Sequence, residues 1–421
     1  MKKKFLIFIY IFLIILYNLM PLSICDDQID NEIIDVNTEI ISNSTNKNSI
    51  KVPETNSRAC VVIDRNTNTI LYGKNENTKR KMASTTKIMT ATIIIENYNL
   101  DETIEVSKKA AGTGGSRLGL KTGDKITIRD LLYGLMLCSG NDAAVALAEY
   151  ASGNIQEFAK LMNQKAAELG LNNTHFETPH GLDADEHYTT AYELALLSNY
   201  ALNNKTFAQI VGTKTHTITI NGYSKTLSNT NELLGSLDGV YGIKTGFTNG
   251  ANRCLVTAYK KNNMDIICVV LGADTKKFRT QDSIKLINYI SDNFEPINIK
   301  NLINDKFEQW KNDNINSFII NKGISNNITL ELEDIDKSII PMRKDLISSI
   351  NISINCPLYF EAPLKEKNNI GYINVYISEN CTLNYKIYNS TEIEKKNWKN
   401  YLFYILKNYN NILNNSLTEQ I

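Results

Sequence analysis

The spacing of hydrophobic residues changes along this chain, and the changes predict how it folds. Two alternating segments at 59–64 and 69–73 indicate a β-hairpin, after which apolar residues recur at helical spacing to about residue 200. The period then becomes two, and a last helical segment follows at 283–294. The alternating segments are 215–220, 240–248, 253–259 and 264–271. Such a chain brings both its ends into one antiparallel sheet beside a helical layer, so we predict an α+β fold for residues 57–296.

A second domain is predicted from residue 297 to residue 389. Its alternating segments are short and are separated by Asn, Gly, Pro and acidic residues, as at 328–332, 350–354 and 372–377. This pattern is typical of a small all-β sandwich.

Residues 390–421 return to helical spacing. Trp398, Leu402, Ile405, Tyr409 and Ile412 fall on one stripe, and lysines lie among the polar positions. The longest unbroken apolar run, 401–406, is far too short to cross a bilayer. The pattern favours an amphipathic helix that lies in the membrane surface, and a helix packed on the sandwich is the alternative.

The first 25 residues have the pattern of a secretory signal peptide. Three lysines precede an apolar run from Phe5 to about Tyr17, and small residues near Cys25 precede two aspartates. An uncleaved signal anchor and a lipoprotein modified at Cys25 are the alternatives. Residues 26–56 are rich in Asn, Ser and acidic residues, so we predict a polar linker. We expect an exported protein at the outer face of the cytoplasmic membrane or in the cell wall.

Composition argues against several kinds of partner. Lys+Arg and Asp+Glu balance at 45 each, which gives no electrostatic reason to expect nucleic acid. Seven cysteines without metal-binding spacing, and only four histidines, argue against a structural zinc site, and we expect neither metal nor cofactor. Cys356 and Cys381 could pair within the second domain, which the sequence does not decide.

The chemistry is predicted to centre on residues 82–90. Ser84 and Lys87 lie three residues apart at the start of an apolar run, so one helical turn places both on the same face. A serine hydroxyl is a poor nucleophile until a base takes its proton, and a neutral lysine can do so. Burial and a second cation nearby both depress a lysine pKa, so the site needs another positive charge. A second S-x-x-K, at 44–47, lies in a polar run that has no apolar face to bury.

Two further triplets, Ser-Gly-Asn and Lys-Thr-Gly, each occur twice in the chain. The residues around each copy indicate which copy belongs to the predicted site. Ser139-Gly-Asn141 interrupts two apolar helical segments and would place a hydroxyl and an amide in a shared cleft. Ser152-Gly-Asn154 instead ends a helix, where glycine is an ordinary cap. Lys244-Thr-Gly246 lies in an alternating segment, so its lysine and glycine face one side and its threonine the other. Lys121-Thr-Gly123 is typical of a turn.

In chain order, the selected motifs resemble those of the low-molecular-weight penicillin-binding proteins, the serine-type D-alanyl-D-alanine carboxypeptidase family. Other segments are similar to that family as well: 59–64, 71–74, 126–149, 180–183, 190–192, 242–246, 269–272 and 362–364. The resemblance covers roughly residues 55–415. It implies a penicillin-binding-protein or β-lactamase-like fold with a C-terminal β domain and amphipathic anchor. It also implies removal of the terminal D-alanine from peptidoglycan stem pentapeptides through an acyl-serine, and covalent binding of β-lactam antibiotics.

The resemblance also implies a role for each residue. Ser84 attacks the substrate carbonyl, Lys87 takes its proton, Ser139 passes a proton to the leaving amine, and Asn141 holds the substrate amide. The implied substrate-binding residues are Lys244, Thr245, Gly246, Phe247 and Arg279. Among these, Lys244 attracts the terminal carboxylate, and Thr245 and Arg279 bind it. The backbone N–H groups of Ser84 and Phe247 receive the oxyanion, and Gly246 leaves room for the substrate.

Other functions stay open. A serine β-lactamase needs a deacylating base, for which Glu177 is the candidate in the right region. A catalytically idle wall-binding or β-lactam-sensing protein could use the same fold. Transpeptidation is a closer rival, because an amine can attack the acyl enzyme instead of water.

Overall fold

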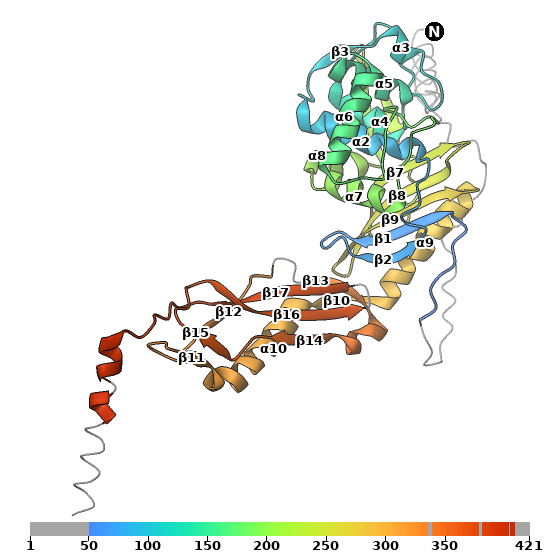
Figure 1. Cartoon of the computed structure of the whole chain (residues 1–421). Coiled ribbons are helices and arrows are strands. Elements are labelled where there is room, and N and C mark those ends of the chain that lie inside the picture. The colour runs from blue at the N-terminus through green and yellow to red at the C-terminus, as the bar shows by residue number, and fades with distance from the viewer. Residues whose placement is uncertain (1–49, 336–338, 379–380, 404, 409–421) are drawn as a thin grey trace, which may run out of the picture. The chain divides into compact units, whose positions relative to one another are not determined.

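The computed structural model describes residues 50–335, 339–378, 381–403 and 405–408. The described chain forms two compact units, one that ends at Phe294 and one that begins at Glu295 (Figure 1). The predicted signal peptide, and all of the predicted linker before residue 50, lie outside the described residues.

The first unit is built on a five-stranded antiparallel sheet with strand order β2-β1-β9-β8-β7 (Figure 1). The five strands are β1 (Ala59–Asp64), β2 (Ile70–Lys74), β7 (Val240–Thr248), β8 (Asn252–Lys261) and β9 (Met264–Ala273). Strand β1, from the start of the unit, pairs along its whole length with β9 near its end. This confirms the predicted α+β fold in which both ends enter one sheet.

Helices cover both faces of this sheet. On one face α7 and α8 contact the strands and share one hydrophobic cluster with α2, α4, α5 and α6, while the other face packs against α9. The helices are α2 (Lys87–Asn97), α3 (Lys108–Ala111), α4 (Ile128–Leu137), α5 (Asn141–Ser152), α6 (Ile155–Glu168), α7 (Ala191–Leu202), α8 (Lys205–Val211) and α9 (Lys276–Asn293). Two small antiparallel pairs join β3 (Thr103–Glu105) with β4 (Lys125–Thr127) and β5 (Thr215–Ile220) with β6 (Tyr223–Ser228), and only the second pair is a hairpin. Helix α9 begins seven residues before its predicted start, because the Thr275 hydroxyl caps it by accepting from the Phe278 amide.

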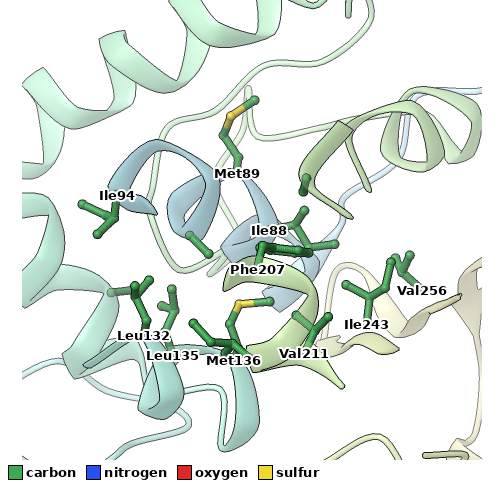
Figure 2. Close-up of a cluster of buried hydrophobic side chains, with 14 of the residues drawn as sticks. Ile88, Met89, Ile94, Leu132, Leu135, Met136, Phe207, Val211, Ile243 and Val256 are labelled. Carbon is green, nitrogen blue, oxygen red and sulfur yellow. The ribbon is translucent and has the colours of Figure 1, made fainter. Parts of the chain in front are cut away.

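Helix α2 lies at the centre of the helical layer. Its first eight residues are all buried, as expected for a helix that is apolar on every side. Figure 2 shows its side chains Ile88, Met89 and Ile94 among those of α4, α8 and the sheet. The helix that carries Lys87 is therefore held by packing around its whole circumference.

The second unit contains a four-stranded antiparallel sheet, β12-β17-β16-β14, and two pairs of short strands, β10-β13 and β11-β15. Its strands are β10 (Phe294–Asn298), β11 (Ile319–Asn321), β12 (Leu330–Leu332), β13 (Ile339–Arg343), β14 (Asn351–Asn355), β15 (Tyr359–Glu361), β16 (Asn368–Ser378) and β17 (Cys381–Asn389). The sequence pattern predicted an all-β unit, and this prediction was wrong, because the unit also contains a long helix. Helix α10 (Ile299–Asn314) buries Ile299, Ile303 and Phe307 in its core. These residues are four apart, which is helical spacing.

The strand register argues against the Cys356–Cys381 disulfide. Cys356 lies against Gly371 near one end of β16, whereas Cys381 pairs with Ser378 at the other end. Seven residues of strand separate these positions, which corresponds to about 23 Å at the usual rise. A disulfide needs Cα atoms within about 7 Å, so the two cysteines do not pair within this sheet.

Residues 398–403 and 405–408 are helical, within the segment predicted to be an amphipathic helix. Trp398, Leu402 and Ile405, three members of the predicted stripe, are 48–69% exposed. Tyr409 and Ile412 lie outside the described residues. Among the described helices, none is both long enough and apolar enough to span a membrane.

The role of α10 can be tested with Ile303→Ala. Ile303 is fully buried, so its truncation should lower the free energy of unfolding by about 2–4 kcal/mol. Leu302→Ala, at the exposed neighbouring position, should cost less than about 1 kcal/mol. Urea unfolding followed by tryptophan fluorescence reports on this unit, because both tryptophans of the chain, Trp310 and Trp398, belong to it. Equal losses in the two variants would show that α10 is not part of the core.

Candidate active site

The nucleophile candidate lies in a tight turn immediately before α2. Residues Ala83–Thr86 form a 3₁₀ turn, η2, and Ala83 has a φ of +49°, a conformation that is costly for a residue with a side chain. The turn presents Ser84 to a cleft. Lys87 follows one turn later, and its Nζ lies 2.8 Å from Ser84 Oγ. The predicted proximity of these two side chains is confirmed.

Lys87 is fully buried, and its amine is held by acceptors from two other parts of the chain. Lys87 Nζ donates to Asn141 Oδ1 at 2.7 Å and to the carbonyl oxygen of His180 at 2.8 Å. Asn141 Nδ2 in turn donates to the carbonyl of Gly114 at 2.8 Å, which fixes the amide so that its oxygen faces Lys87.

The segment that carries Ser139 and Asn141 joins α4 to α5. Ser139 has a φ of +61° and is almost fully buried, yet it lines the same cleft as Ser84. Asn141 is the first residue of α5. The sequence-based expectation that this triplet interrupts two helices and enters a shared cleft agrees with the structure.

Strand β7 is an edge strand of the sheet and forms another wall of the cleft. Lys244 pairs with Val256 and Thr245 with Leu255 of β8, and these partners belong to the hydrophobic clusters on opposite faces of the sheet. Lys244 and Gly246 therefore face the helical layer. A Cβ atom on Gly246 would lie 3.0 Å from the Ser84 backbone nitrogen, so the strand and the nucleophile turn are in close contact.

Lys244 and Thr245 are both buried. Lys244 Nζ donates to the carbonyl of Thr245 at 3.1 Å. The hydroxyl of Thr245 is hydrogen-bonded to that of Thr230 at 2.7 Å, which ties β7 to the loop that precedes it.

The cleft has a volume of about 380 Å³. Of the predicted residues, Ser84, Ser139, Asn141, Gly246 and Phe247 line it. Six further residues, which no sequence motif had placed in the site, also line the cleft: Gly115, Ser116, Leu182, Asp183, Thr248 and Asn249. Phe247 is 43% exposed, and the guanidinium of Arg253 stacks on its ring at 3.8 Å from the centroid.

Two aspartates that the sequence analysis missed hold the walls of the cleft. Asp142, fully buried, accepts from the backbone N–H groups of Leu118, Gly119 and Leu120 at 2.7–3.0 Å, so it anchors the loop that contains Gly115 and Ser116. Asp183 accepts from the Thr248 hydroxyl at 2.7 Å and from the Gly250 amide at 2.9 Å. Each aspartate directly follows a motif that the sequence had already singled out, Asn141 for Asp142 and His180-Gly-Leu for Asp183. This proximity was the only sequence signal that could have pointed to them.

Arg279 is not among the residues that line the cleft. It is fully buried on α9, and its guanidinium donates to the carboxylate of Glu232, which also accepts from the Thr280 hydroxyl. Although burial raises the pKa of Glu232, the charge of Arg279 and the Thr280 hydrogen bond outweigh it and lower that pKa overall.

Two buried histidines lie beneath the nucleophile turn. Burial, followed by the Lys87 amine when that amine is protonated, lowers the pKa of His180 to about 3. Burial lowers the pKa of His187 to about 4, with smaller contributions from His175 and Lys81 in the same direction and from Asp183 in the other. Both imidazoles are therefore neutral near pH 7.

No cluster of three or more His, Cys, Asp or Glu side chains in the described residues is arranged to hold a metal ion. The reactive groups of the site are a serine hydroxyl and a buried lysine amine beside it, in a cleft bounded by a sheet edge. This is the arrangement of a serine acyl-transfer enzyme that uses lysine in place of histidine.

Comparison with known proteins gives the family. The model of the D-alanyl-D-alanine carboxypeptidase family, peptidase S11, matches residues 46–275, which is more than half of the chain. The chain therefore belongs to this family of serine peptidases.

Curated relatives agree with this assignment. The chain is 39% identical over 244 residues to D-alanyl-D-alanine carboxypeptidase DacF of Bacillus subtilis, a match that covers 56% of this chain. That match spans only 63% of DacF, less than two thirds of its length. DacD of Escherichia coli is 37% identical over 260 residues, which cover 59% of this chain and 66% of DacD.

Solved structures are similar as well. D-alanyl-D-alanine carboxypeptidase DacD from Francisella tularensis has a TM-score of 0.64 at 27% identity, and the match covers 84% of this chain and 98% of that one. The Streptomyces K15 DD-transpeptidase has a TM-score of 0.55 at 36% identity over 57% of this chain and 98% of that one. The penicillin-binding-protein-like fold predicted from the motifs is thus confirmed.

His187→Gln should change how stability depends on pH. An unfolded histidine takes up a proton near pH 6.5, whereas buried His187 does so only near pH 4, so the native state loses about 3 kcal/mol as pH falls through this range. Glutamine keeps polar groups at the position but does not titrate. Urea unfolding at intervals between pH 7 and pH 4 should show a loss in the variant smaller by a similar amount. An unchanged pH dependence would show that His187 takes up its proton at the same pH in the native state as in the unfolded state.

Proposed function

We propose that this protein is a serine D-alanyl-D-alanine carboxypeptidase that shortens peptidoglycan stem pentapeptides by one residue and is acylated by penicillins at Ser84. The observation that carries the proposal is the position of Lys87 Nζ, 2.8 Å from Ser84 Oγ and buried between two acceptors. Family membership supports the substrate class.

The first step is transfer of the Ser84 proton to Lys87. Asn141 Oδ1 and the His180 carbonyl can only accept hydrogen bonds from Lys87, so a neutral amine directs both its N–H bonds to them. Its lone pair then points at Ser84 Oγ, the third neighbour. Lys87 is fully buried, and burial disfavours the charged form of an amine. In this role Asn141 orients the base as well as lining the cleft.

Ser84 Oγ then bonds to the carbonyl carbon of the penultimate D-alanine. The resulting oxyanion accepts from the backbone N–H groups of Ser84 and Phe247, which lie on the two elements that Gly246 brings into contact. The substrate C–N bond breaks, the leaving amine takes a proton through Ser139, and D-alanine departs. Water then hydrolyses the ester and restores Ser84.

The terminal carboxylate of the substrate is bound at Lys244 and Thr245. Both side chains belong to the edge strand, along which an extended peptide can add as a further strand. Arg279 was expected to share this task, but its pairing with Glu232 favours a supporting role, in which it holds the Asn229–Glu232 loop against α9.

The β-lactamase alternative receives no support from the cleft. Glu177, its candidate base, is not among the residues that line the described cleft, and its carboxylate accepts from the Glu186 amide at 2.9 Å. Transpeptidation remains the second candidate, because the similar sequence from Streptomyces K15 is named a D-alanyl-D-alanine carboxypeptidase and the similar structure from K15 a DD-transpeptidase.

The test is release of D-alanine from diacetyl-L-Lys-D-Ala-D-Ala. Ser84→Ala should lower the rate at least about 10³-fold, since no nucleophile remains, while Ser44→Ala, in the second S-x-x-K, should leave it unchanged. Including glycylglycine as an acceptor separates the two reactions, because transpeptidation yields a longer peptide. Penicillin turnover without D-alanine release would contradict the proposal, as would full activity in Ser84→Ala.

We also propose that the protein is exported and that the predicted amphipathic segment, residues 390–421, binds the membrane surface. The supporting observations are the signal-peptide pattern and the exposure of Trp398, Leu402 and Ile405 on one helical stripe. A chain that begins at Asp26 should float with vesicles that contain anionic lipid, and the same chain ending at Lys396 should not. Equal binding by the two chains would exclude this role for the helix.

A further inference from the structure

A chain of hydrogen bonds runs from a buried histidine to the peptide bond of the nucleophile turn. His187 Nδ1 lies 3.0 Å from the Glu177 backbone nitrogen, and His187 Nε2 lies 2.7 Å from Thr86 Oγ1. Thr86 Oγ1 lies 2.8 Å from the carbonyl oxygen of Ala83. His187 and Thr86 are both buried, so these groups depend on one another for partners.

The direction of every bond in the chain follows from its two ends. A backbone N–H can only donate, so His187 Nδ1 accepts from Glu177 and the proton of the neutral imidazole is on Nε2. His187 Nε2–H therefore donates to Thr86 Oγ1. The Ala83 carbonyl can only accept, so it receives the Thr86 hydroxyl proton.

The Ala83 carbonyl belongs to the same peptide group as the Ser84 N–H. In a trans peptide these two groups point in opposite directions. Ser84 N faces β7, as its 3.0 Å distance from a Cβ built on Gly246 shows, and the Ala83 carbonyl faces the interior. On that side Gly181 covers the carbonyl so closely that a Cβ at Gly181 would lie 1.9 Å from the oxygen. The hydrogen bond from Thr86 is thus shielded from water.

We infer that His187 and Thr86 are positioning residues whose relay holds and polarises the Ala83–Ser84 peptide, so that its N–H is a stronger donor to the oxyanion. A hydrogen bond accepted at the carbonyl draws electron density from the nitrogen, which strengthens the N–H as a donor in a chain of bonds. The relay also fixes the turn at Ala83, whose positive φ is unfavourable without such support. This inference rests on the proposed acyl-serine function and adds to it two groups that do not touch substrate.

The chain offers a matched control. Thr85 Oγ1 makes the same kind of bond to the carbonyl of Met82, at 2.6 Å, and is also fully buried. Its acceptor belongs to the preceding peptide, which carries no oxyanion donor. Thr85→Val and Thr86→Val thus remove equivalent buried hydroxyl groups, and only Thr86→Val breaks the relay.

The experiment measures the acylation rate constant at saturating fluorescent penicillin, separately from the dissociation constant of the non-covalent complex. Thr86→Val should slow acylation on the order of tenfold with little change in dissociation constant, since the relay acts on the oxyanion that forms during acylation. Thr86→Ser keeps the hydroxyl and should stay within about twofold of wild type, and Thr85→Val within about threefold. Thr86→Val combined with His187→Leu should be no slower than the slower single variant, because either change interrupts the same chain.

A spectroscopic measurement gives an independent readout. Weaker donation to the acyl carbonyl raises its stretching frequency, so the infrared band of the penicilloyl ester should move to higher wavenumber in Thr86→Val and remain in place in Thr85→Val. Equal slowing in Thr85→Val and Thr86→Val, or a wild-type rate in Thr86→Val, would overturn the relay. Absence of acylation in the wild-type protein would instead refute the proposed function itself.

Discussion

The site depends on one physical requirement: a lysine amine with no exposed surface must stay within hydrogen-bonding distance of a serine hydroxyl. A buried amine is stable only where hydrogen-bonding partners surround it, and Lys87 has such partners in Asn141, the His180 carbonyl and Ser84. These partners come from three separate parts of the chain. The packing of α2 on all sides holds the lysine backbone still, so that all three can be placed around one nitrogen.

The same requirement explains why small residues surround the nucleophile turn. Gly181 approaches the Ala83 carbonyl and Gly246 approaches the Ser84 nitrogen, and at both places a side chain would meet backbone atoms. The turn is therefore confined between the segment that supplies the His180 carbonyl and the edge strand that supplies Lys244. A cleft assembled in this way has little freedom to rearrange when substrate binds, which is the condition for electrostatic stabilisation of an oxyanion.

Local sequence signals were sufficient for the elements and for the residues nearest to the chemistry. Helical spacing placed Ser84 beside Lys87, and the period of two placed Lys244 and Gly246 on one face of β7. Asp142, Asp183, Thr86 and His187 could not be found in this way, because their partners are distant in sequence and their own surroundings carry no repeating pattern. Helix α10 did carry a signal, at Ile299, Ile303 and Phe307, but the alternating segments around it obscured the helical period.

Arg279 and Lys244, the two cations predicted to bind the substrate carboxylate, have different partners in the fold, and this difference bears on their roles. The Arg279 guanidinium has a carboxylate partner, Glu232, whose lowered pKa keeps it ionised, so the pair has little net charge to offer an anion. Lys244 lies on the edge strand two residues before Gly246, and its ammonium donates to the Thr245 carbonyl. A substrate carboxylate at Arg279 would have to compete with Glu232 for the guanidinium. The edge strand contacts the nucleophile turn at Gly246, so it is better placed than α9 to orient a substrate toward Ser84.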